Sequence, residues 1–257
     1  GTSSLAHLIN NHSKVYIAPK ELHFFDYLGK YWKRWKLGLN WYSKQFSDAK
    51  EGQIIGEKTP TYSYLKDVPE RISKTIPNVK LIWILRNPIT RTYSNYWHAV
   101  FNGTENESFS NAIRLESNRI KSNIWCGYKT RSLYSDQIKR YLKYFDLDQM
   151  LFLTFEEFKQ NPEATSKKVC DFLDIKFELT MLEENDVSNK SKLPYNRKIR
   201  YWTIKLFGST SFISKIEKKI NSKSSKYPTM SIKDSNYLKE SFNQPNEELK
   251  KLTGLNI

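Results

Sequence analysis

The sequence predicts a single α/β domain over residues 1–257, with a central parallel sheet flanked by helices and a helical C-terminal part. Its length of 257 residues and its mass of 30.5 kDa suit one domain with a sizeable core. Short apolar runs alternate with longer segments of helical periodicity, which is the pattern of parallel strands joined by crossover helices. The run "VKLIWIL" at 79–85 is continuously apolar, as is typical of a strand covered on both faces.

Four strands are predicted from short apolar runs that end in polar or turn-forming residues. They lie at 15–18, 53–58, 79–85 and 150–155. The second strand ends at Glu57 or Lys58, because Pro60 cannot continue the ladder of a central strand.

Helices are predicted where apolar residues recur three or four positions apart. They lie at 2–12, 68–77, 88–102, 108–121, 132–145 and 161–175, and the pattern is helical again from Ser209 onward. The aromatic and basic residues 27–46 predict two short helices that separate near Gly38. Residues 183–200 are polar and basic, which predicts a surface loop.

The composition is basic and poor in cysteine. Lysine and arginine number 42 against 27 aspartates and glutamates, a formal net charge of +15. Such a surface attracts nucleic acid, anionic lipid, acidic glycans or phosphorylated nucleotides, and charge alone does not choose among them. Cys126 and Cys170 are too few for a disulfide framework or a cysteine zinc site, so both are expected in the core. No apolar run approaches the ~20 residues of a transmembrane helix.

Polar residues at three predicted strand or helix ends indicate an anion site, since ligands of open parallel sheets bind at the carboxyl ends of strands. "GTSS" opens the first helix and can wrap backbone amides round a phosphate, or simply cap the helix. It is not a Walker A motif, because no Gly-Lys-Ser/Thr follows. Lys58 follows the second strand, where it can neutralise a phosphate or form a surface ion pair.

The third such end carries Arg86 and Ser94. Arg86 leaves the strand 79–85, and Ser94 lies two turns into the following helix, facing back toward the same edge. Alternatively, Arg86 pairs with a carboxylate and Ser94 packs. Two anion sites at adjacent strand ends suggest a nucleotide with two separated phosphates.

Together these residues resemble the sulfotransferases that use 3′-phosphoadenosine 5′-phosphosulfate (PAPS). The resemblance is closest to the branch that contains the heparan sulfate N- and 3-O-sulfotransferases and their microbial relatives. The matching pieces occur in family order across nearly the whole chain: "GTSSL", "KELHFFD", "GEKTPTY", "LIWILRNPITRTYSNY", "RSLYSDQIKRYLKYF" and "PNEELKKLTG".

The resemblance implies a P-loop-like phosphosulfate loop and in-line transfer of a sulfuryl group from PAPS to an acceptor hydroxyl or amine, leaving 3′,5′-adenosine bisphosphate (PAP) and needing no metal. The loop that would hold the 5′-phosphate and the sulfuryl group comprises Gly1, Thr2, Ser3, Ser4 and Leu5. Arg86 and Ser94 match the pair that grips the 3′-phosphate, for which a planar guanidinium is well suited. Tyr134 either helps line the cofactor site or belongs to the core.

The resemblance also assigns the acid–base residues. Glu21 matches the general base, which typically contributes ~10²–10⁴ in rate. His23 would assist or orient the acceptor, and it is the second choice for the base. Lys58 matches the lysine near the transferring group, whereas Lys20 would serve the site or simply be solvated.

The chain departs from the family at two places. Family members usually carry Lys or Arg two residues before the glycine of the phosphosulfate loop, so we expect a strand and this lysine upstream of Gly1. Golgi relatives have a cysteine pair bracketing a loop that ends in Lys-Gly-Arg, and "NKSKLPYNRK" has neither, so Lys192, Arg197 or Lys198 would contact the 3′-phosphate instead. The missing pair favours a cytoplasmic microbial enzyme, and a Golgi location would require an upstream anchor.

The acceptor and two rival functions are left open by the residues. "YWKRWKLGLNWY" at 31–42 alternates aromatic and cationic residues, which suits sugar stacking or core aromatics with snorkelling lysines. A carbohydrate acceptor fits the branch, with lipid, small-molecule and polyketide acceptors as alternatives.

Two rival functions are considered. A phosphoryl transferase would need the absent Walker A motif and a magnesium-binding Asp. A non-enzymatic binder of polyanions or nucleic acid would explain the charge but not Glu21, Glu57 and Arg86, so no nucleic-acid partner is expected.

Overall fold

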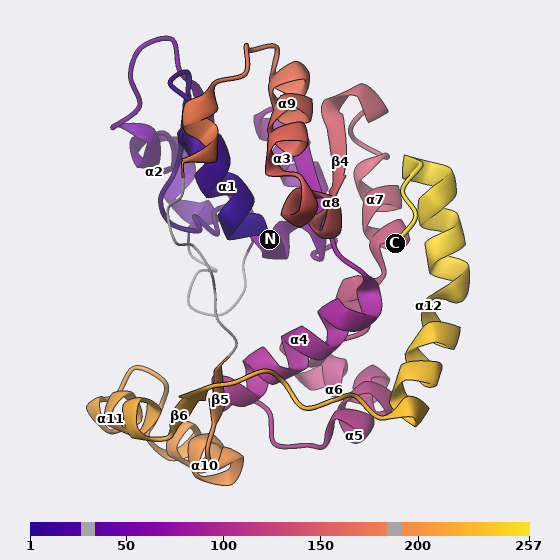
Figure 1. Ribbon diagram of the computed structural model, residues 1–257. Helices are drawn as coiled ribbons and strands as arrows, with labels where there is room; N and C mark the ends of the chain where they lie inside the picture. The colour runs from indigo at the N-terminus through magenta and orange to yellow at the C-terminus, as the bar shows by residue number, and fades with distance from the viewer. Residues whose placement is uncertain (27–33, 184–191) are drawn as a thin grey trace. The chain divides into compact units, whose positions relative to one another are not determined.

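A computed structural model of the chain describes residues 1–26, 34–183 and 192–257 (Figure 1). The chain forms two compact units. Unit 1 contains Gly1–Arg86, Ser135–Ser188 and Leu249–Asn256, and unit 2 contains Asn87–Tyr134 and Asn189–Glu248, with Ile257. Helices and parallel strands confirm the predicted α/β class, whereas the single domain over residues 1–257 stays a prediction.

Unit 1 contains two pairs of parallel strands. β1 (Val15–Ile17) pairs with β2 (Ile54–Gly56), and β3 (Leu81–Leu85) pairs with β4 (Met150–Thr154), which confirms the four predicted strands and their direction. Gly56 permits the close approach of the first pair, because a Cβ there would lie 2.8 Å from Ile17 Cδ1. In β3 only Trp83 and Leu85 are fully buried, so the expectation of a strand covered throughout on both faces was too strong.

The helices of unit 1 precede, separate or follow these strands in the chain. They are α1 (Thr2–Asn10), α2 (Gly38–Ser43), α3 (Val68–Thr75), α7 (Tyr134–Tyr141), α8 (Phe155–Gln160) and α9 (Pro162–Leu173). Five short 3₁₀ turns accompany them in the described residues: η2 (Trp35–Leu37), η3 (Lys44–Phe46), η4 (Pro60–Ser63), η7 (Leu147–Gln149) and η8 (Leu179–Leu182). Helix α8 was not predicted, because "MLFLTF" was assigned wholly to a strand. Thr154 ends β4 and caps α8 by accepting a hydrogen bond from the Glu157 amide.

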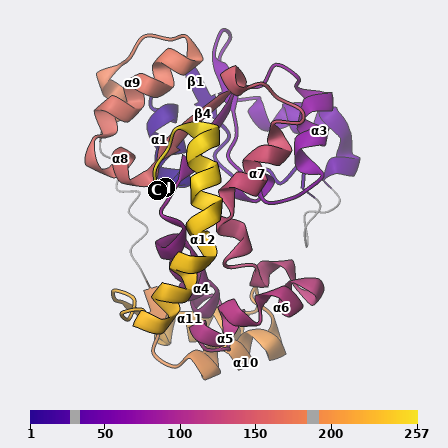
Figure 2. The ribbon, with the colours of Figure 1, turned by 90° about the vertical axis from the view of Figure 1, so that its right-hand side faces the viewer.

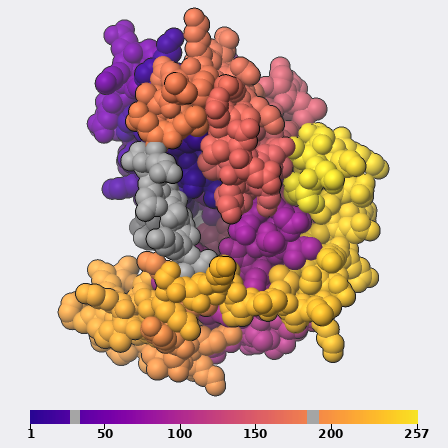
Figure 3. Space-filling view, viewed as in Figure 1, coloured from indigo at the N-terminus to yellow at the C-terminus, as the bar shows by residue number. Residues whose placement is uncertain are grey.

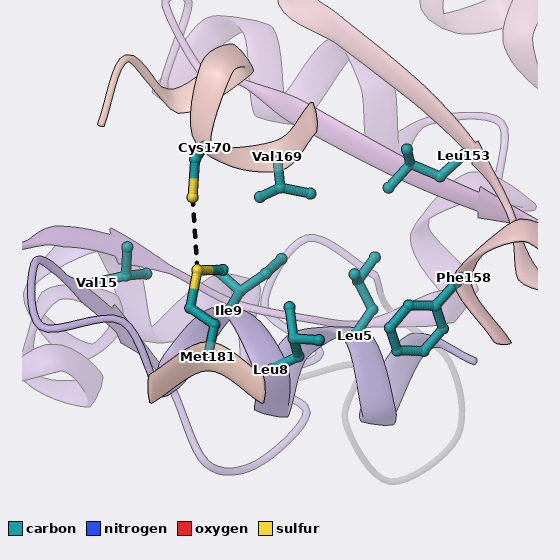
Figure 4. Packing of buried hydrophobic residues seen from close by; sticks show 9 residues of the cluster. All are labelled: Leu5, Leu8, Ile9, Val15, Leu153, Phe158, Val169, Cys170 and Met181. Atoms are coloured by element: carbon teal, nitrogen blue, oxygen red, sulfur yellow. Dashed lines mark hydrogen bonds between the residues drawn. The ribbon is translucent and has the colours of Figure 1, made fainter. Parts of the chain in front are cut away.

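The core of unit 1 joins α1 to the second strand pair and to α9 (Figure 4). Its buried members are Leu5, Leu8, Ile9, Val15, Leu153, Phe158, Val169, Cys170 and Met181. Cys170 Sγ lies 3.5 Å from Met181 Sδ. Cys126 is also buried, so the expectation that both cysteines are core thiols is confirmed. Gly1, at the start of α1, lies near Ile84 of β3 and near Phe155, which follows β4.

Unit 2 is mostly helical. Its helices are α4 (Pro88–Phe101), α5 (Phe109–Arg114), α6 (Glu116–Ser122), α10 (Arg197–Phe207), α11 (Phe212–Ile220) and most of α12 (Ile232–Thr253), with the turns η5 (Ile124–Cys126) and η6 (Thr130–Ser132). Tyr96 and Val100 of α4 pack with Phe109 of α5 and with Leu238 and Phe242 of α12, which lies in front of α4 in the view of Figure 2.

The predicted surface loop at 183–200 is wrong at its C-terminal end. β5 (Lys192–Pro194) pairs antiparallel with β6 (Ser222–Ser224), and α10 begins at Arg197, capped by the Asn196 side chain. Residues 184–191 lie outside the described residues. Both strands are only three residues long, and β6 is polar throughout, so they give no hydrophobic period.

Three predicted helices differ at their bounds. The segment 108–121 divides into two helices at Leu115, and the segment 132–145 is helical only from Tyr134 to Tyr141. Two short helices are predicted at 27–46. Residues 27–33 of this segment lie outside the described residues, and residues from 35 onward form η2, α2 and η3. Gly38, where the two helices are expected to separate, has a positive φ of 71°.

Candidate active site

The first turn of α1 lies beside two cations that follow strands. Lys58 Nζ donates a hydrogen bond to Ser3 Oγ at 2.9 Å. The Arg86 guanidinium carbon lies 5.5 Å from the ring centroid of Phe155, and a Cβ on Gly1 would lie 3.1 Å from the same ring. Glycine at position 1 therefore allows the helix start to approach Phe155 closely.

This helix end fits an anion. Among the residues that the structure describes, no side chain makes a capping hydrogen bond to α1, and the first amide N–H groups of any helix point out of its end. The helix dipole and the two cations add positive potential at the same place. A phosphate or sulfate group bound there would accept hydrogen bonds from the backbone and from Lys58. The structure thus brings together the predicted loop residues, Lys58 and Arg86.

A second cluster consists of Glu21, His23 and Asp26, from the loop after β1. His23 Nδ1 lies 2.7 Å from Asp26 Oδ2, and His23 Nε2 lies 3.3 Å from Glu21 Oε2. Asp26 is fully buried and also accepts a hydrogen bond from Thr61 Oγ1 at 2.6 Å. The Glu21 side chain is 41% exposed, so the chain of hydrogen-bonding groups runs from the interior to an accessible carboxylate.

In this cluster, the two carboxylates and the imidazole each favour the charged form of the other. Burial alone would lower the pKa of His23, but the hydrogen bonds and charges of Asp26 and Glu21 outweigh it and raise this pKa to about 9. The hydrogen bond from His23 lowers the pKa of Glu21, and the charge of Lys58 lowers it further. At neutral pH Glu21 is therefore an ionised carboxylate held by an imidazolium.

A buried hydrogen-bond network around Glu57 fixes the loop that carries the cluster. Glu57 accepts hydrogen bonds from Thr59 Oγ1 at 2.8 Å and from Tyr42 OH at 3.0 Å. Tyr62 OH lies 3.3 Å from both carboxylate oxygens and accepts a hydrogen bond from the Phe24 amide at 2.8 Å. Burial raises the pKa of Glu57, although these hydrogen bonds oppose the rise. The network ties the loop that holds His23 to the segment after β2.

Aromatic residues cover the same loop. The ring centroid of Phe24 lies 5.2 Å from that of Trp35, 6.0 Å from that of Trp41 and 4.6 Å from that of Tyr42. Arg34 donates hydrogen bonds to the Leu22 and Glu21 carbonyls. From residue 34 onward, the half-buried rings of Trp35, Trp41 and Tyr42 therefore pack on the loop.

The remaining predicted site residues lie in unit 2, except for the exposed Lys20 of unit 1. Ser94 is half-buried on α4, and Tyr134 is buried with the Arg91 guanidinium 5.9 Å from its ring. Arg197 donates hydrogen bonds to Tyr96 OH at 3.1 Å and to the Glu107 carbonyl at 2.6 Å, so it helps to hold unit 2 together.

Lys192 and Lys198 are exposed. The functional roles assigned to the unit 2 residues from the sequence stay predictions.

Sequence reasoning missed Asp26 and Thr61. Asp26 is the last residue of the quoted motif "KELHFFD", and an acidic residue three positions after a histidine was the available signal.

Among residues 1–26, 34–183 and 192–257 there is no group of three or more His, Cys, Asp or Glu side chains that could hold a metal ion. In the same residues, no helix is long and apolar enough to cross a membrane.

Comparison with known proteins identifies relatives. The family model described as "Sulfotransferase domain" matches residues 38–253. Heparan sulfate glucosamine 3-O-sulfotransferase 3A1 of Mus musculus is 32% identical over 177 residues, which are 68% of this chain and 43% of that protein. Heparan sulfate glucosamine 3-O-sulfotransferase 6 of Homo sapiens is 31% identical over 176 residues, 68% of this chain and 49% of that protein. The chain thus spans less than half the length of these relatives.

Solved structures share the fold. A sulfotransferase from Alicyclobacillus acidocaldarius matches with a TM-score of 0.73 and 22% identity, covering 100% of this chain and 92% of that one. The sulfotransferase domain from the curacin biosynthetic pathway matches with a TM-score of 0.52 and 16% identity, covering 95% of this chain and 93% of that one.

Proposed function

Because the chain belongs to the sulfotransferase family, we propose that it transfers a sulfuryl group from PAPS to a hydroxyl or amine of a carbohydrate acceptor. One observation carries the proposal: the Glu21–His23–Asp26 cluster and the anion site at α1 occur in the same unit, and the charge of Lys58 acts on both. Sulfuryl transfer needs a proton acceptor beside a site that stabilises negative charge.

In this mechanism Glu21 accepts the proton of the acceptor hydroxyl or amine. Its carboxylate is exposed enough to be reached and is ionised at neutral pH. His23 is a positioning residue that holds Glu21 through Nε2, and Asp26 fixes the ring through Nδ1. Because both carboxylates favour the charged imidazole, His23 stays protonated and leaves Glu21 as the group free to take a proton.

The donor would be held at its two charged ends. The first turn of α1, with Lys58, fits the 5′-phosphate and the sulfuryl group, and Lys58 would neutralise the charge that develops on the leaving phosphate. We assign the 3′-phosphate to Arg86 and Ser94, with Tyr134 lining the nucleotide and Lys192, Arg197 or Lys198 as further cationic contacts.

The acceptor assignment rests on the relatives. The matched proteins are named for transfer to glucosamine of heparan sulfate, and they cover 68% of this chain. We therefore propose a sugar hydroxyl or amine as the acceptor group.

Calorimetric titration with PAP tests the donor site. We expect micromolar binding of PAP by the wild type, no comparable binding of 5′-AMP, and loss of PAP binding in Arg86→Ala. Arg114→Ala is the matched control, because Arg114 pairs with Asp234 in unit 2 and has no assigned role in the site. Equal affinity for PAP and 5′-AMP, or undiminished binding by Arg86→Ala, would contradict the assignment.

Transfer from radiolabelled PAPS to a panel of oligosaccharides tests the reaction. Glu21→Gln should lower kcat about 10²–10⁴-fold while leaving PAP binding intact, because the amide keeps the shape but cannot accept the proton. Failure of the wild type to label any acceptor, or full activity of Glu21→Gln, would reject the proposed chemistry.

A further inference from the structure

Helices α10 and α11 of unit 2 expose an unusual amount of apolar surface. On α10 the exposed apolar residues include Ile199, Trp202 and Leu206, which recur at i, i+3 and i+7 and therefore share one face. On α11 they are Phe212, Ile213, Ile216 and Ile220. Phe212 is 77% exposed and Leu206 69%. Each helix thus presents an apolar stripe to solvent, and we call these two stripes the apolar face of the hairpin.

The other side of the two helices is fixed by polar contacts. Arg200 is buried, donates a hydrogen bond to the Ser214 carbonyl at 3.0 Å and pairs with Glu217. Its Nε donates to the Phe101 carbonyl of α4 at 3.1 Å. Ser211 caps α11, and the left-handed Gly208 ends α10. Because these contacts orient both helices, the apolar face is a fixed property of the hairpin.

The same segment is strongly cationic. Residues 192–226 contain ten lysines and arginines and one acidic residue, Glu217, which already pairs with Arg200. Lys198 and Lys205 on α10, and Lys215 and Lys219 on α11, are exposed alongside the apolar residues. Lys205 Nζ lies 4.8 Å from the Trp202 ring, so an aromatic and a cation stand together at the edge of the apolar face.

Apolar stripes bordered by lysines and a tryptophan match the chemistry of an anionic membrane surface. The apolar side chains would enter the boundary between head groups and acyl chains, and the lysines would contact anionic head groups. Neither helix approaches the ~20 apolar residues that a span requires. We propose that the α10–α11 hairpin docks the protein on the surface of a membrane that contains anionic lipid.

Two other occupants fit less well. A second copy of this hairpin would bring two strongly cationic surfaces together, which costs free energy through like-charge repulsion. An acidic glycan or a nucleic acid would use the lysines but would leave the aliphatic side chains in water. In Figure 3 the atoms of the hairpin, orange and gold at the lower left, lie open at the surface of unit 2.

Sedimentation with lipid vesicles tests the proposal on the whole chain. We expect binding to vesicles of phosphatidylcholine with 30% phosphatidylglycerol and little binding to phosphatidylcholine alone. Leu206→Ser with Phe212→Ser should lower the partition coefficient at least tenfold, because both remove apolar side chains that would be inserted. The matched control is Leu147→Ser with Leu179→Ser, which removes similarly exposed apolar residues from unit 1 and should change little.

Substitution of lysines provides a second, independent test of the proposal in the same vesicle assay. Lys215→Gln and Lys219→Gln should each weaken binding about fivefold at low salt, whereas Lys143→Gln and Lys159→Gln of unit 1 should not. Binding that ignores the apolar substitutions but falls with every lysine removed would show general attraction of a basic protein and overturn the proposal. Self-association lost in Leu206→Ser with Phe212→Ser would instead identify a second copy as the occupant.

Discussion

Replacing Asp26 by asparagine should lower the pKa of His23 and change how stability depends on pH. The substitution keeps the size of a fully buried side chain and removes the charge that lies 2.7 Å from His23 Nδ1. Glu21 remains, but its side chain is 41% exposed and its Oε2 lies farther away, 3.3 Å from His23 Nε2. Burial then favours the neutral ring, so we expect the pKa of His23 to fall from about 9 to near its ordinary value of 6.5.

The size of the effect follows from the two pKa values. The difference between 6.5 and about 9 corresponds to roughly 3 kcal/mol of free energy of unfolding. Because the pKa of His23 is raised in the folded state, this contribution is complete below pH 6.5 and is lost as the pH rises through 9. The free energy of unfolding of the wild type should exceed that of Asp26→Asn at pH 6. This difference should be roughly 2–3 kcal/mol larger at pH 6 than at pH 10.

Urea unfolding at the two pH values and NMR titration of the histidine rings measure both quantities. The chain has four histidines, and His23→Gln identifies the signal that belongs to His23. His98 of unit 2 is the internal control, since burial lowers its pKa and Asp26 has no part in that shift. An unchanged His23 titration in Asp26→Asn, or a stability difference that is the same at pH 6 and pH 10, would refute the electrostatic account of the cluster.

Two predictions concern packing. Gly103→Ala should cost more than ~4 kcal/mol of stability, because Gly103 has φ 73° and a Cβ would lie 2.5 Å from Ile204 Cγ1 and 2.8 Å from the Arg200 carbonyl oxygen. Gly52→Ala, at φ 78° with nothing within 4 Å, should cost only ~1–2 kcal/mol, and equal losses in thermal unfolding would argue against the close contact. Leu153→Ala should cost ~2–5 kcal/mol in urea unfolding, and a loss below ~1 kcal/mol would show that the core of unit 1 is not packed as described.

The parts of the fold that could be predicted are those with a strong hydrophobic pattern. The apolar runs of β3 and β4 end at polar residues, so the position of Arg86 after a strand followed from the sequence. The strands β5 and β6 could not be predicted, because each is only three residues long and leaves no hydrophobic pattern. Helix α8 was not predicted, because its first residue, Phe155, is the last residue of the apolar run 150–155, which has the pattern of a strand.

The sequence supplied candidate residues for the site but not their arrangement. Glu21, His23 and Lys58 were identified because they occur in recognisable motifs. The role of Asp26 depends on the backbone of His23, which adopts a left-handed conformation with φ 48°. Non-glycine residues seldom adopt this conformation, and spacing in the sequence does not reveal it.

That backbone conformation has an evolutionary consequence. This conformation costs about 1 kcal/mol at one residue, and it allows all three members of the Glu21–His23–Asp26 cluster to come from six consecutive residues, 21–26. The anion site, in contrast, is drawn from α1, from Lys58 and from Arg86, which lie far apart in the chain. Substitutions in this one short loop can therefore alter the carboxylate cluster while the residues around the start of α1 stay the same.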